Sequence, residues 1–469
     1  EMDDFLREIQ TSLFREWINN QKRDYYHLHQ SETDPDAIII ENEYCYSYVT
    51  FNPQCIIELC VMNKRTDEMA FYLHFQFKTL KHAISLFEEM DQCIKKMIDQ
   101  PICRLLLCCS GGMTTAFFAD KIKNGIKVLN LNMEVAATSY QKIYNVAQNY
   151  DVILLAPQVS YVKLQVEKVF KNKLVLKIPT QIFASYNVGA LITFVEESLK
   201  HKENKYNGYI EPLASMMEIK TNKNVLAVSI NANGENSHIS YRLYNSHQDI
   251  VLDSNIIKSN IKLQDVLDAL DTVVLQNEMI DVISIALPGV MVEGNVYSGI
   301  IEGGNHQLKE RLEKRYEKEI YLINDVNAAV VGYYASQNEY KSLAFLFQPI
   351  GRMAGSGIVV NGQLVRGMDH LAGEVALLPL NLSDAYLTLA NTPEGTLELV
   401  TKNIMSIIAI VAPEAIVVYS DLILDSQDVS DEIKKALSQY PLKVYPQIIK
   451  VENILEYILL GAMILSAKE

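Results

Sequence analysis

A cysteine followed by small and hydroxyl residues stands where an apolar run meets a helical pattern. Residues 102–108 are mostly apolar, the next seven residues are Cys-Ser-Gly-Gly-Met-Thr-Thr beginning at Cys109, and a helical pattern starts at Ala116. A loop between a strand and a helix directs several backbone N–H groups and the positive helix end at one point, which suits phosphate. The same field makes a thiol more nucleophilic. This layout indicates a phosphate-accepting or phosphate-sensing cysteine.

A second interpretation of Cys109 stays open at this point. It could be a buried cysteine at a strand end, which is how we read Cys103 and Cys108. The adjoining Gly-Gly pair and the two threonines favour the first interpretation.

The thiol segment also resembles a known family. Residues 109–115, together with Asp-Val-Ile-Leu-Leu-Ala-Pro-Gln-Val at 151–159, are similar to enzyme IIB of the lactose/cellobiose class of the bacterial phosphotransferase system. In that family the first loop cysteine takes phosphate from a phosphohistidine on enzyme IIA and passes it to a sugar. The resemblance covers about residues 102–200 and implies enzyme IIA or a related phosphocarrier as a partner. It implies Cys109 as the phosphorylated residue and a phosphate cradle made by Ser110, Gly111, Gly112, Met113, Thr114 and Thr115.

The same segment, read without the family, alternates strands and helices. Apolar runs predict strands near 102–108, 127–132, 151–155 and 173–177, with helices between them and a last helix near 189–200. Such alternation predicts a small four-stranded parallel sheet over residues 101–200.

The overall composition is that of a globular protein. The chain has 469 residues, 49% of them hydrophobic and 21% charged, which is enough for two to four domains. No apolar run reaches the roughly 20 residues of a membrane helix, and three of the first four residues are acidic, where a signal peptide would be basic. We therefore expect a cytoplasmic protein with no membrane insertion. The net charge of −15 argues against direct nucleic-acid binding.

Cysteine placement excludes two further classes of site. All 7 cysteines fall within the first 109 residues, without Cys-x-x-Cys spacing or nearby histidine pairs. We expect neither a zinc site nor a disulfide framework.

The pattern of the first hundred residues predicts an α+β module, whose role the sequence does not indicate. A helical pattern over 2–20 runs through Phe5, Ile9, Leu13 and Trp17. Short alternating runs and one further helix follow, which predicts an antiparallel meander and nothing like a helix-turn-helix. Without partners nearby in the sequence, His74 and His82 are expected to be structural or surface residues. The runs are 37–41, 44–51, 55–62 and 69–77, and the helix is 79–98.

A new domain is expected over residues 223–469, after a polar linker at 201–222. Four of its segments, in order, resemble the ROK family, which groups sugar kinases with sugar-responsive repressors. The resemblance implies two ribonuclease-H-like subdomains of the actin/hexokinase type around a cleft, with a final helix at 454–467 packing on the first. The whole chain is thus expected to be an α/β multidomain protein. The four segments are 285–289, 323–329, 355–362 and 371–375.

The sugar side of the ROK pattern is kept. Asp325 stands where the family has its catalytic base, and Glu374 stands where the family holds sugar hydroxyls. A competing interpretation makes Asp325 only the cap of the helix that starts near Asn327. The sugar-binding residues implied by the resemblance are Asn324, Asp325, His370, Gly373 and Glu374.

The nucleotide side of the ROK pattern is altered in three places. The first phosphate loop reads Ser-Ile-Asn-Ala-Asn at 229–233, without the family's acidic residue and glycines. The second reads Gly-Arg-Met at 351–353, where two long side chains are expected to fill the phosphate space, and the adenosine loop reads Tyr-Ser-Asp at 419–421. Leu377 replaces the histidine of the family's zinc motif, so no metal is predicted. We expect no cofactor, and ATP with magnesium only if the domain is an active kinase.

Three function classes follow from these patterns. The leading hypothesis is a phosphotransferase-linked sensor that binds a sugar or sugar phosphate without phosphorylating it and accepts or senses phosphate at Cys109. The second is an enzyme, either an active ROK sugar kinase with Asp325 as base or a genuine IIB transferase. The third is a scaffold with only interaction surfaces. Motif residues identify neither the sugar nor the oligomeric state, and a homo-oligomer is one option.

Overall fold

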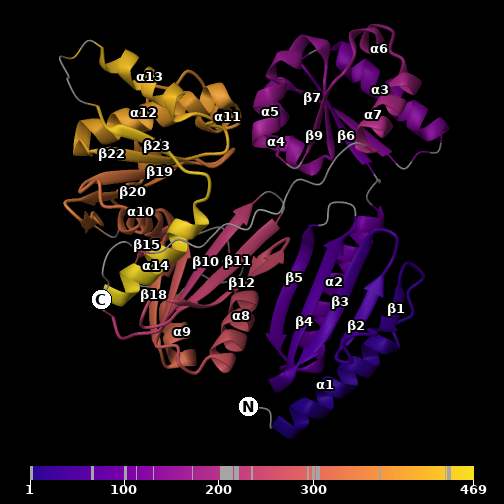
Figure 1. Cartoon of the computed structure of the whole chain (residues 1–469), viewed down its shortest axis with the longest axis vertical. Coiled ribbons are helices and arrows are strands. Elements are labelled where there is room, and N and C mark those ends of the chain that lie inside the picture. The colour runs from indigo at the N-terminus through magenta and orange to yellow at the C-terminus, as the bar shows by residue number, and fades with distance from the viewer. Residues whose placement is uncertain are drawn as a thin grey trace. The chain divides into compact units, whose positions relative to one another are not determined.

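The protein is described by a computed structural model and forms two compact units (Figure 1). The first unit comprises Glu1–Gln100, Met217–Ala328 and Ile458–Glu469, and the second comprises Pro101–Met216 and Ala329–Tyr457. The predicted linker at 201–222 lies almost entirely outside the described residues. The described residues are 4–64, 68–99, 103–111, 113–129, 131, 133–171, 173–200, 215, 221–233, 236–292, 295–297, 301–302, 307–368, 371–438, 440 and 445–468.

The first unit is built on one ten-stranded sheet, in the order β1-β2-β3-β4-β5-β12-β11-β10-β14-β18. The four predicted runs of the antiparallel meander are confirmed as β2 to β5, and β1, which was not predicted, pairs with β2. The last strand of the meander continues into the second half of the chain, because Tyr72 on β5 pairs with Ile257 on β12. The strands are β1 (His27–Gln30), β2 (Ala37–Glu41), β3 (Cys45–Asn52), β4 (Ile56–Asn63), β5 (Met69–Gln76), β10 (Val225–Asn233), β11 (Asn236–Tyr244), β12 (Ile250–Lys258), β14 (Val282–Leu287) and β18 (Glu319–Asn324).

Helices and two short strand pairs also belong to the described part of this unit. Parallel β13 and β17 form one pair, and antiparallel β15 and β16 form the other. The helices are α1 (Asp4–Asn19), α2 (Leu80–Asp99), α8 (Leu263–Gln276) and α9 (Leu308–Tyr316), and the short strands are β13 (Ile261–Lys262), β15 (Val290–Val292), β16 (Asn295–Tyr297) and β17 (Ile301–Glu302).

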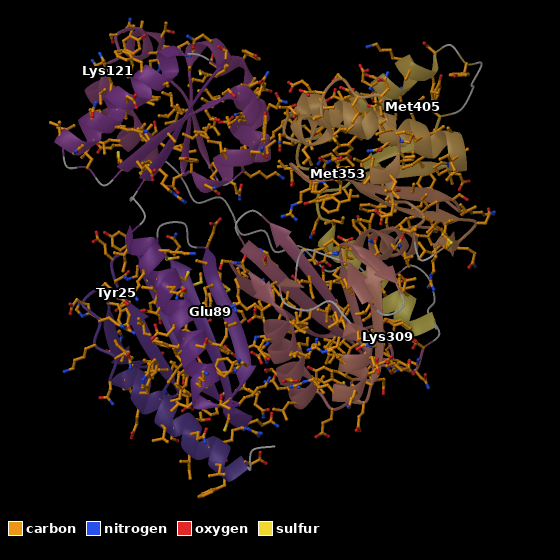
Figure 2. The ribbon with its side chains drawn as sticks, turned by 180° about the vertical axis from the view of Figure 1, so that it is seen from behind. Tyr25, Glu89, Lys121, Lys309, Met353 and Met405 are labelled. Atoms are coloured by element: carbon orange, nitrogen blue, oxygen red, sulfur yellow. The ribbon has the colours of Figure 1, made fainter. Side chains whose placement is uncertain are left out.

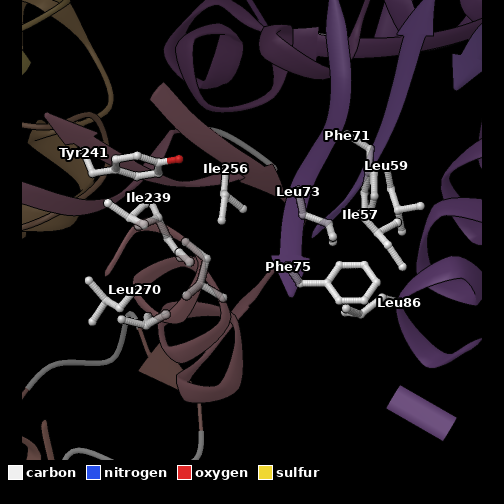
Figure 3. Close-up of a cluster of buried hydrophobic side chains, with 14 of the residues drawn as sticks. Ile57, Leu59, Phe71, Leu73, Phe75, Leu86, Ile239, Tyr241, Ile256 and Leu270 are labelled. Carbon is white, nitrogen blue, oxygen red and sulfur yellow. The ribbon is translucent and has the colours of Figure 1, made fainter. Parts of the chain in front are cut away.

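One continuous hydrophobic core joins the N-terminal hundred residues to the strands after residue 225 (Figure 3). It combines Leu73 and Phe75 of β5 with Ile239 and Ile256 of β11 and β12. The predicted first helix is confirmed as α1, but its buried residues are Phe14 and Ile18. Of the expected face, Phe5, Ile9 and Leu13 are exposed and Trp17 is half-buried.

Buried polar contacts also tie these two segments together. The Tyr241 hydroxyl and His74 Nε2 are 2.7 Å apart, and burial lowers the pKa of His74 to about 4. Lys258, which is almost fully buried, contacts Asp265 Oδ1 at 2.6 Å and Glu89 Oε2 at 2.5 Å (Glu89 is labelled in Figure 2). Pairing of this kind is what a buried charge requires.

His82 pairs with Asp268, which lies far from it in the sequence. Its Nε2 atom lies 2.9 Å from Asp268 Oδ2, and Lys78 Nζ lies 2.7 Å from Asp268 Oδ1. Burial alone would raise the pKa of Asp268, but His82 and Lys78 outweigh it and lower that pKa. His74 and His82 are therefore both structural, as expected, at a junction formed by distant segments.

The C-terminal helix α14 (Leu455–Lys468) ends in the first unit. The hydroxyl of Ser284 on β14 donates to the Ala462 carbonyl at 2.8 Å. The predicted return of this helix to the first subdomain is confirmed.

The second unit contains the predicted four-stranded parallel sheet, in the order β7-β6-β8-β9. Helices α3 and α7 cover one face and α4 and α5 the other (Figure 1). The elements are β6 (Cys103–Cys109), α3 (Met113–Val128), β7 (Met133–Ser139), α4 (Ile143–Val146), β8 (Val152–Leu155), α5 (Lys163–Val169), β9 (Leu174–Lys177), α6 (Thr180–Ala184) and α7 (Val188–Lys200).

The strand predicted at 127–132 is wrong. Helix α3 extends to Val128, because Ile122 and Ile126 are four residues apart and both buried. Val128 and Leu129, which made the run look like a strand, are 84% and 56% exposed. The true second strand is β7, paired in parallel with β6.

A second sheet in this unit has five strands, in the order β21-β20-β19-β22-β23. Strand β20 is antiparallel to β19, whereas β19, β22 and β23 are parallel. Its elements are α10 (Asp325–Ala335), which begins in the first unit, β19 (Leu343–Phe347), β20 (Gly355–Val360), β21 (Gln363–Leu364), α11 (Tyr386–Leu389), α12 (Pro393–Val411), β22 (Ala415–Tyr419), α13 (Ser426–Leu437) and β23 (Gln447–Lys450).

No described helix is long and apolar enough to cross a membrane.

Candidate functional site

Cys109 is the last residue of β6, at the edge where the parallel strands end. It pairs with Ser139 of β7 and is only 6% exposed. The backbone N–H of Gly111 donates to its sulfur at 3.3 Å, and the sulfur lies 3.9 Å from the carbonyl oxygen of Thr138. An N–H directed at the sulfur can stabilise negative charge that develops there.

The neighbouring cysteine has different surroundings. Burial raises the pKa of Cys108 to about 12, and the adjacent Cys109 adds to the effect. Cys108 therefore stays a thiol near neutral pH and serves as a core residue. All seven cysteines lie at described positions and are free thiols.

The predicted cradle is only partly described. Ser110 and Gly111 are exposed, and Gly111 has a φ of +104°, which glycine adopts without strain. Gly112 lies outside the described residues, and the segment Met113–Thr115 forms the first turn of α3, with side chains outside the description. The first N–H groups of a helix have no partner within it, so this turn can bind an anion.

Exposed apolar side chains follow the strands at this same edge, and sequence reasoning missed them. Tyr161 and Leu164, which come after β8, are exposed, as is Phe117 on α3. Lys121 Nζ, labelled in Figure 2, lies 5.0 Å from the centre of the Phe117 ring. A group of exposed aromatic and apolar side chains is typical of a protein-docking surface.

The start of α10 holds the first two predicted sugar residues. Asn324 Oδ1 accepts hydrogen bonds from the N–H groups of Val326 and Asn327, each at 3.0 Å, while Asn324 Nδ2 donates to the Gly289 carbonyl at 3.1 Å. Asn324 is therefore the helix cap and holds this turn against the end of β14. Asp325 is 7% exposed, and its Oδ1 accepts from the N–H of Val326 at 2.9 Å.

Because Asn324 caps the helix, capping does not by itself explain an aspartate at 325. A second polar residue lies two positions further along the helix. The Oδ1 atom of Asn327 is buried and has no hydrogen-bond partner among the described residues. Buried acceptors of this kind are usually satisfied, so this one can serve a ligand.

The other two described sugar residues lie beside β20. Gly373 has a φ of +92°, and a Cβ atom there would lie 2.0 Å from the Ser356 carbonyl oxygen, so the position requires glycine. Glu374 is half-buried, and burial raises its pKa. Within the described chain, neither the Glu374 carboxylate nor the buried Ser356 hydroxyl has a hydrogen-bond partner. His370 lies outside the described residues.

Asn324 and Asp325 belong to the first unit, whereas Gly373 and Glu374 belong to the second. The structure therefore describes the two pairs separately. Among the described residues, no three histidine, cysteine, aspartate or glutamate side chains are grouped as a metal ion would need.

The loop at Gly351 is closed by a backbone hydrogen bond and by two asparagine side chains. Gly351 has a φ of +65°, and its N–H donates to the Ala390 carbonyl at 2.9 Å. A Cβ atom on Gly351 would lie 2.7 Å from Asn391 Oδ1 and 3.2 Å from Asn145 Oδ1. The side chains of Arg352 and Met353 are exposed (Met353 is labelled in Figure 2).

The other two altered loops are at the end of β22 and on β10. The ring of Tyr419, at the end of β22, lies 5.4 Å from the ring of Phe347. The Ser229 hydroxyl on β10 is buried and has no partner among the described residues.

Family models account for both halves of this arrangement. A model described as "PTS system, Lactose/Cellobiose specific IIB subunit" matches residues 104–193, and one described as "ROK family" matches residues 234–395. The chain carries a IIB domain followed by a ROK domain. The suspected fusion of these two domains is thereby confirmed, as is the mixed α/β fold class. A comparison with curated proteins gives no match.

Solved structures of both domain types are similar to parts of the chain. A ROK family protein from Streptococcus pneumoniae in complex with sucrose is 19% identical over 52% of this chain and 97% of its own, with a TM-score of 0.41. A ROK hexokinase from Thermus thermophilus is 17% identical over 52% and 99%, with a TM-score of 0.43. A lactose-specific IIB domain from Streptococcus pneumoniae is 23% identical over 20% and 95%, with a TM-score of 0.19.

Proposed function

We propose that the protein is a carbohydrate sensor linked to the phosphotransferase system. Its ROK domain binds a sugar or sugar phosphate without ATP-dependent phosphorylation, and its IIB domain accepts or senses phosphate at Cys109. The observation that carries this proposal is the closed loop at Gly351. Its N–H already bonds to Ala390, and the side chains of Asn391 and Asn145 lie over its open side. A phosphate-binding glycine needs both its N–H and that space.

The sugar side supports binding. Sugar hydroxyls are recognised by carboxylate, amide and hydroxyl groups whose hydrogen bonds are not already made within the protein. The ROK domain keeps such groups on Asn327, Ser356 and Glu374. The raised pKa of Glu374 reflects its burial, and a partly desolvated carboxylate forms stronger hydrogen bonds to hydroxyl groups.

The thiol side supports phosphoryl transfer from a phosphohistidine on enzyme IIA or a related phosphocarrier. The Cys109 sulfur would attack phosphorus, an S–P bond would form, and the N–P bond would break. The imidazole nitrogen would leave with the electron pair of that bond and take up the proton that the thiol releases. The Gly111 N–H and the first turn of α3 would stabilise the phosphoryl oxygens.

The experiment for the thiol side is phosphate labelling. The purified chain is incubated with the phosphorylated carrier proteins and analysed by mass spectrometry. We expect label on the wild type and on Cys108→Ser, and none on Cys109→Ser. Cys108→Ser is the matched control because it changes the adjacent thiol in the core. An unlabelled wild type would rule out transfer.

The experiment for the ROK domain is calorimetry with sugars, with and without ATP and magnesium. We expect sugar binding that weakens in Glu374→Gln, together with no measurable ATP binding. ATP binding accompanied by sugar turnover that is lost in Asp325→Asn would instead establish the active-kinase alternative. Absence of any sugar binding would favour the scaffold alternative.

A further inference from the structure

The IIB domain contacts the ROK domain within the second unit, and the contact lies on the altered nucleotide loops. The Tyr140 hydroxyl of the IIB domain donates to Glu394 Oε1 at 3.1 Å. Asn145 of the IIB domain lies over Gly351, as described above. Leu422, from the loop after β22, is 2% exposed and belongs to the hydrophobic core of the IIB domain. We call the ROK side of this contact the Gly351 edge, formed by Ile350, Gly351, Asn391, Glu394 and Leu422.

Burial, rather than charge, holds this contact. Leu422 is fully enclosed, and Ile350 packs against the same cluster of IIB side chains. Burial, assisted by the charge of Glu394, raises the pKa of Tyr140, so its hydroxyl remains a donor at neutral pH. The ion pair between Lys171 and Glu452, 3.5 Å long and exposed, adds little.

The contact between the IIB and ROK domains begins at Tyr140, one residue after Ser139, the β7 residue that pairs with Cys109. Ser139 pairs with Cys109, and a Cβ atom on Gly111 would lie 3.8 Å from the Ser139 Cβ. Tyr140 follows directly, and its ring lies edge-on to the buried Tyr144 ring at 6.0 Å. The thiol loop and the Gly351 edge are therefore connected by a single packed segment, residues 138–145.

A change at Cys109 has a direct effect on this segment. As a thiol, the sulfur can donate its hydrogen to the Thr138 carbonyl, 3.9 Å away. Once an S–P bond replaces the S–H bond, that donor is lost and a group carrying about two negative charges lies beside Ser139. Backbone and side chains in contact with such a group must rearrange, because packed interiors do not deform continuously.

We propose that the IIB domain docks permanently on the Gly351 edge, in the place where a kinase would hold nucleotide phosphates. Residues 138–145 then transmit the phosphorylation state of Cys109 to the ROK domain. The transmission part of this inference rests on the proposed function, because it requires phosphorylation of Cys109. The docking part rests on the contacts of Tyr140, Asn145 and Leu422 alone.

The docking part is tested by amide hydrogen exchange on the full chain. Tyr140→Phe removes the hydroxyl that bonds to Glu394 and keeps the ring. Loss of one hydrogen bond of ordinary strength should speed exchange about fivefold in peptides 349–353 and 390–396. Tyr440→Phe, at an exposed tyrosine of the same unit, is the matched control and should leave both peptides unchanged. Equal exchange in wild type and Tyr140→Phe would overturn the docking.

The transmission part is tested by comparing phosphorylated and unphosphorylated wild type. We expect altered exchange in peptide 138–146 and in both peptides of the Gly351 edge. Label on Cys109 without any change at the edge would overturn transmission while the proposed function stands. If Cys109 takes no label, the proposed function fails, and Cys109→Ala then tests whether residues 138–145 connect Cys109 to the edge. This variant removes the contacts of the sulfur with the Thr138 carbonyl and the Gly111 N–H. Unchanged exchange at the edge in Cys109→Ala would then overturn transmission.

Discussion

Proton uptake by His74 in the unfolded chain should lower the stability of the first unit as the pH falls from 7 to 5. His74 lies on β5 and is 6% exposed, with the Tyr241 hydroxyl of β11 at 2.7 Å. Burial lowers its pKa from 6.5 to about 4, so the folded protein holds it neutral. In the unfolded chain it binds a proton as pH falls below about 6.5. Stability is therefore full above that pH and decreases as pH falls toward 4.

The size of the effect follows from the two pKa values. With 6.5 unfolded and about 4 folded, linkage gives a loss of about 2 kcal/mol between pH 7 and pH 5. The chain has 1 tryptophan, Trp17, whose ring lies 5.4 Å from the ring of Phe87 in the first unit. Its fluorescence during urea unfolding reports on this unit without interference from the second.

His74→Gln keeps a polar group beside Tyr241 and cannot titrate. The difference in free energy of unfolding between pH 7 and pH 5 should shrink by about 2 kcal/mol in this variant. His27→Gln, at an exposed histidine of β1, should keep the wild-type dependence on pH. Identical pH dependence in wild type and His74→Gln would refute the reasoning.

Two further substitutions test single positions. Gly373→Ala places a Cβ atom 2.0 Å from the Ser356 carbonyl oxygen at a position with a left-handed φ, so it should destabilise the second unit by about 2–5 kcal/mol and abolish sugar binding. Gly189→Ala is the control, because the atom nearest to its added Cβ would be 3.8 Å away. Amide exchange measures the stability of both variants, and calorimetry measures their sugar binding. Lys258→Met leaves Asp265 buried without its ion pair and should cost about 3–5 kcal/mol by Trp17 fluorescence, with partial recovery on adding Asp265→Asn.

Local patterns predicted the elements that bury one face against a neighbouring segment. The meander, the helix at α2 and three of the four strands of the IIB sheet follow from period-2 or helical spacing. The exception, at 127–132, arose because apolar residues at a helix end, such as Val128, are exposed in the fold. Apolar character alone does not distinguish a strand from a helix end.

Long-range partners could not be predicted. The pairing of Lys78 with Asp268 joins residues 190 positions apart, and nothing near either residue indicates the other. At 324–325 the sequence offered two good capping residues in a row, and only the backbone decides that Asn324 is the cap. The same holds for Asn145, whose position over Gly351 depends on how two separately folded sheets meet.

The pairing of β5 with β12 indicates a structural role for the N-terminal hundred residues. Without them, β12 would become the outer strand of the ROK sheet and would present a row of unpaired backbone groups to solvent. Such an open border invites self-association with other chains. The N-terminal module therefore covers the edge of the ROK sheet, and a chain shortened to begin near residue 223 would be prone to aggregate even though every proposed sugar-binding residue was retained.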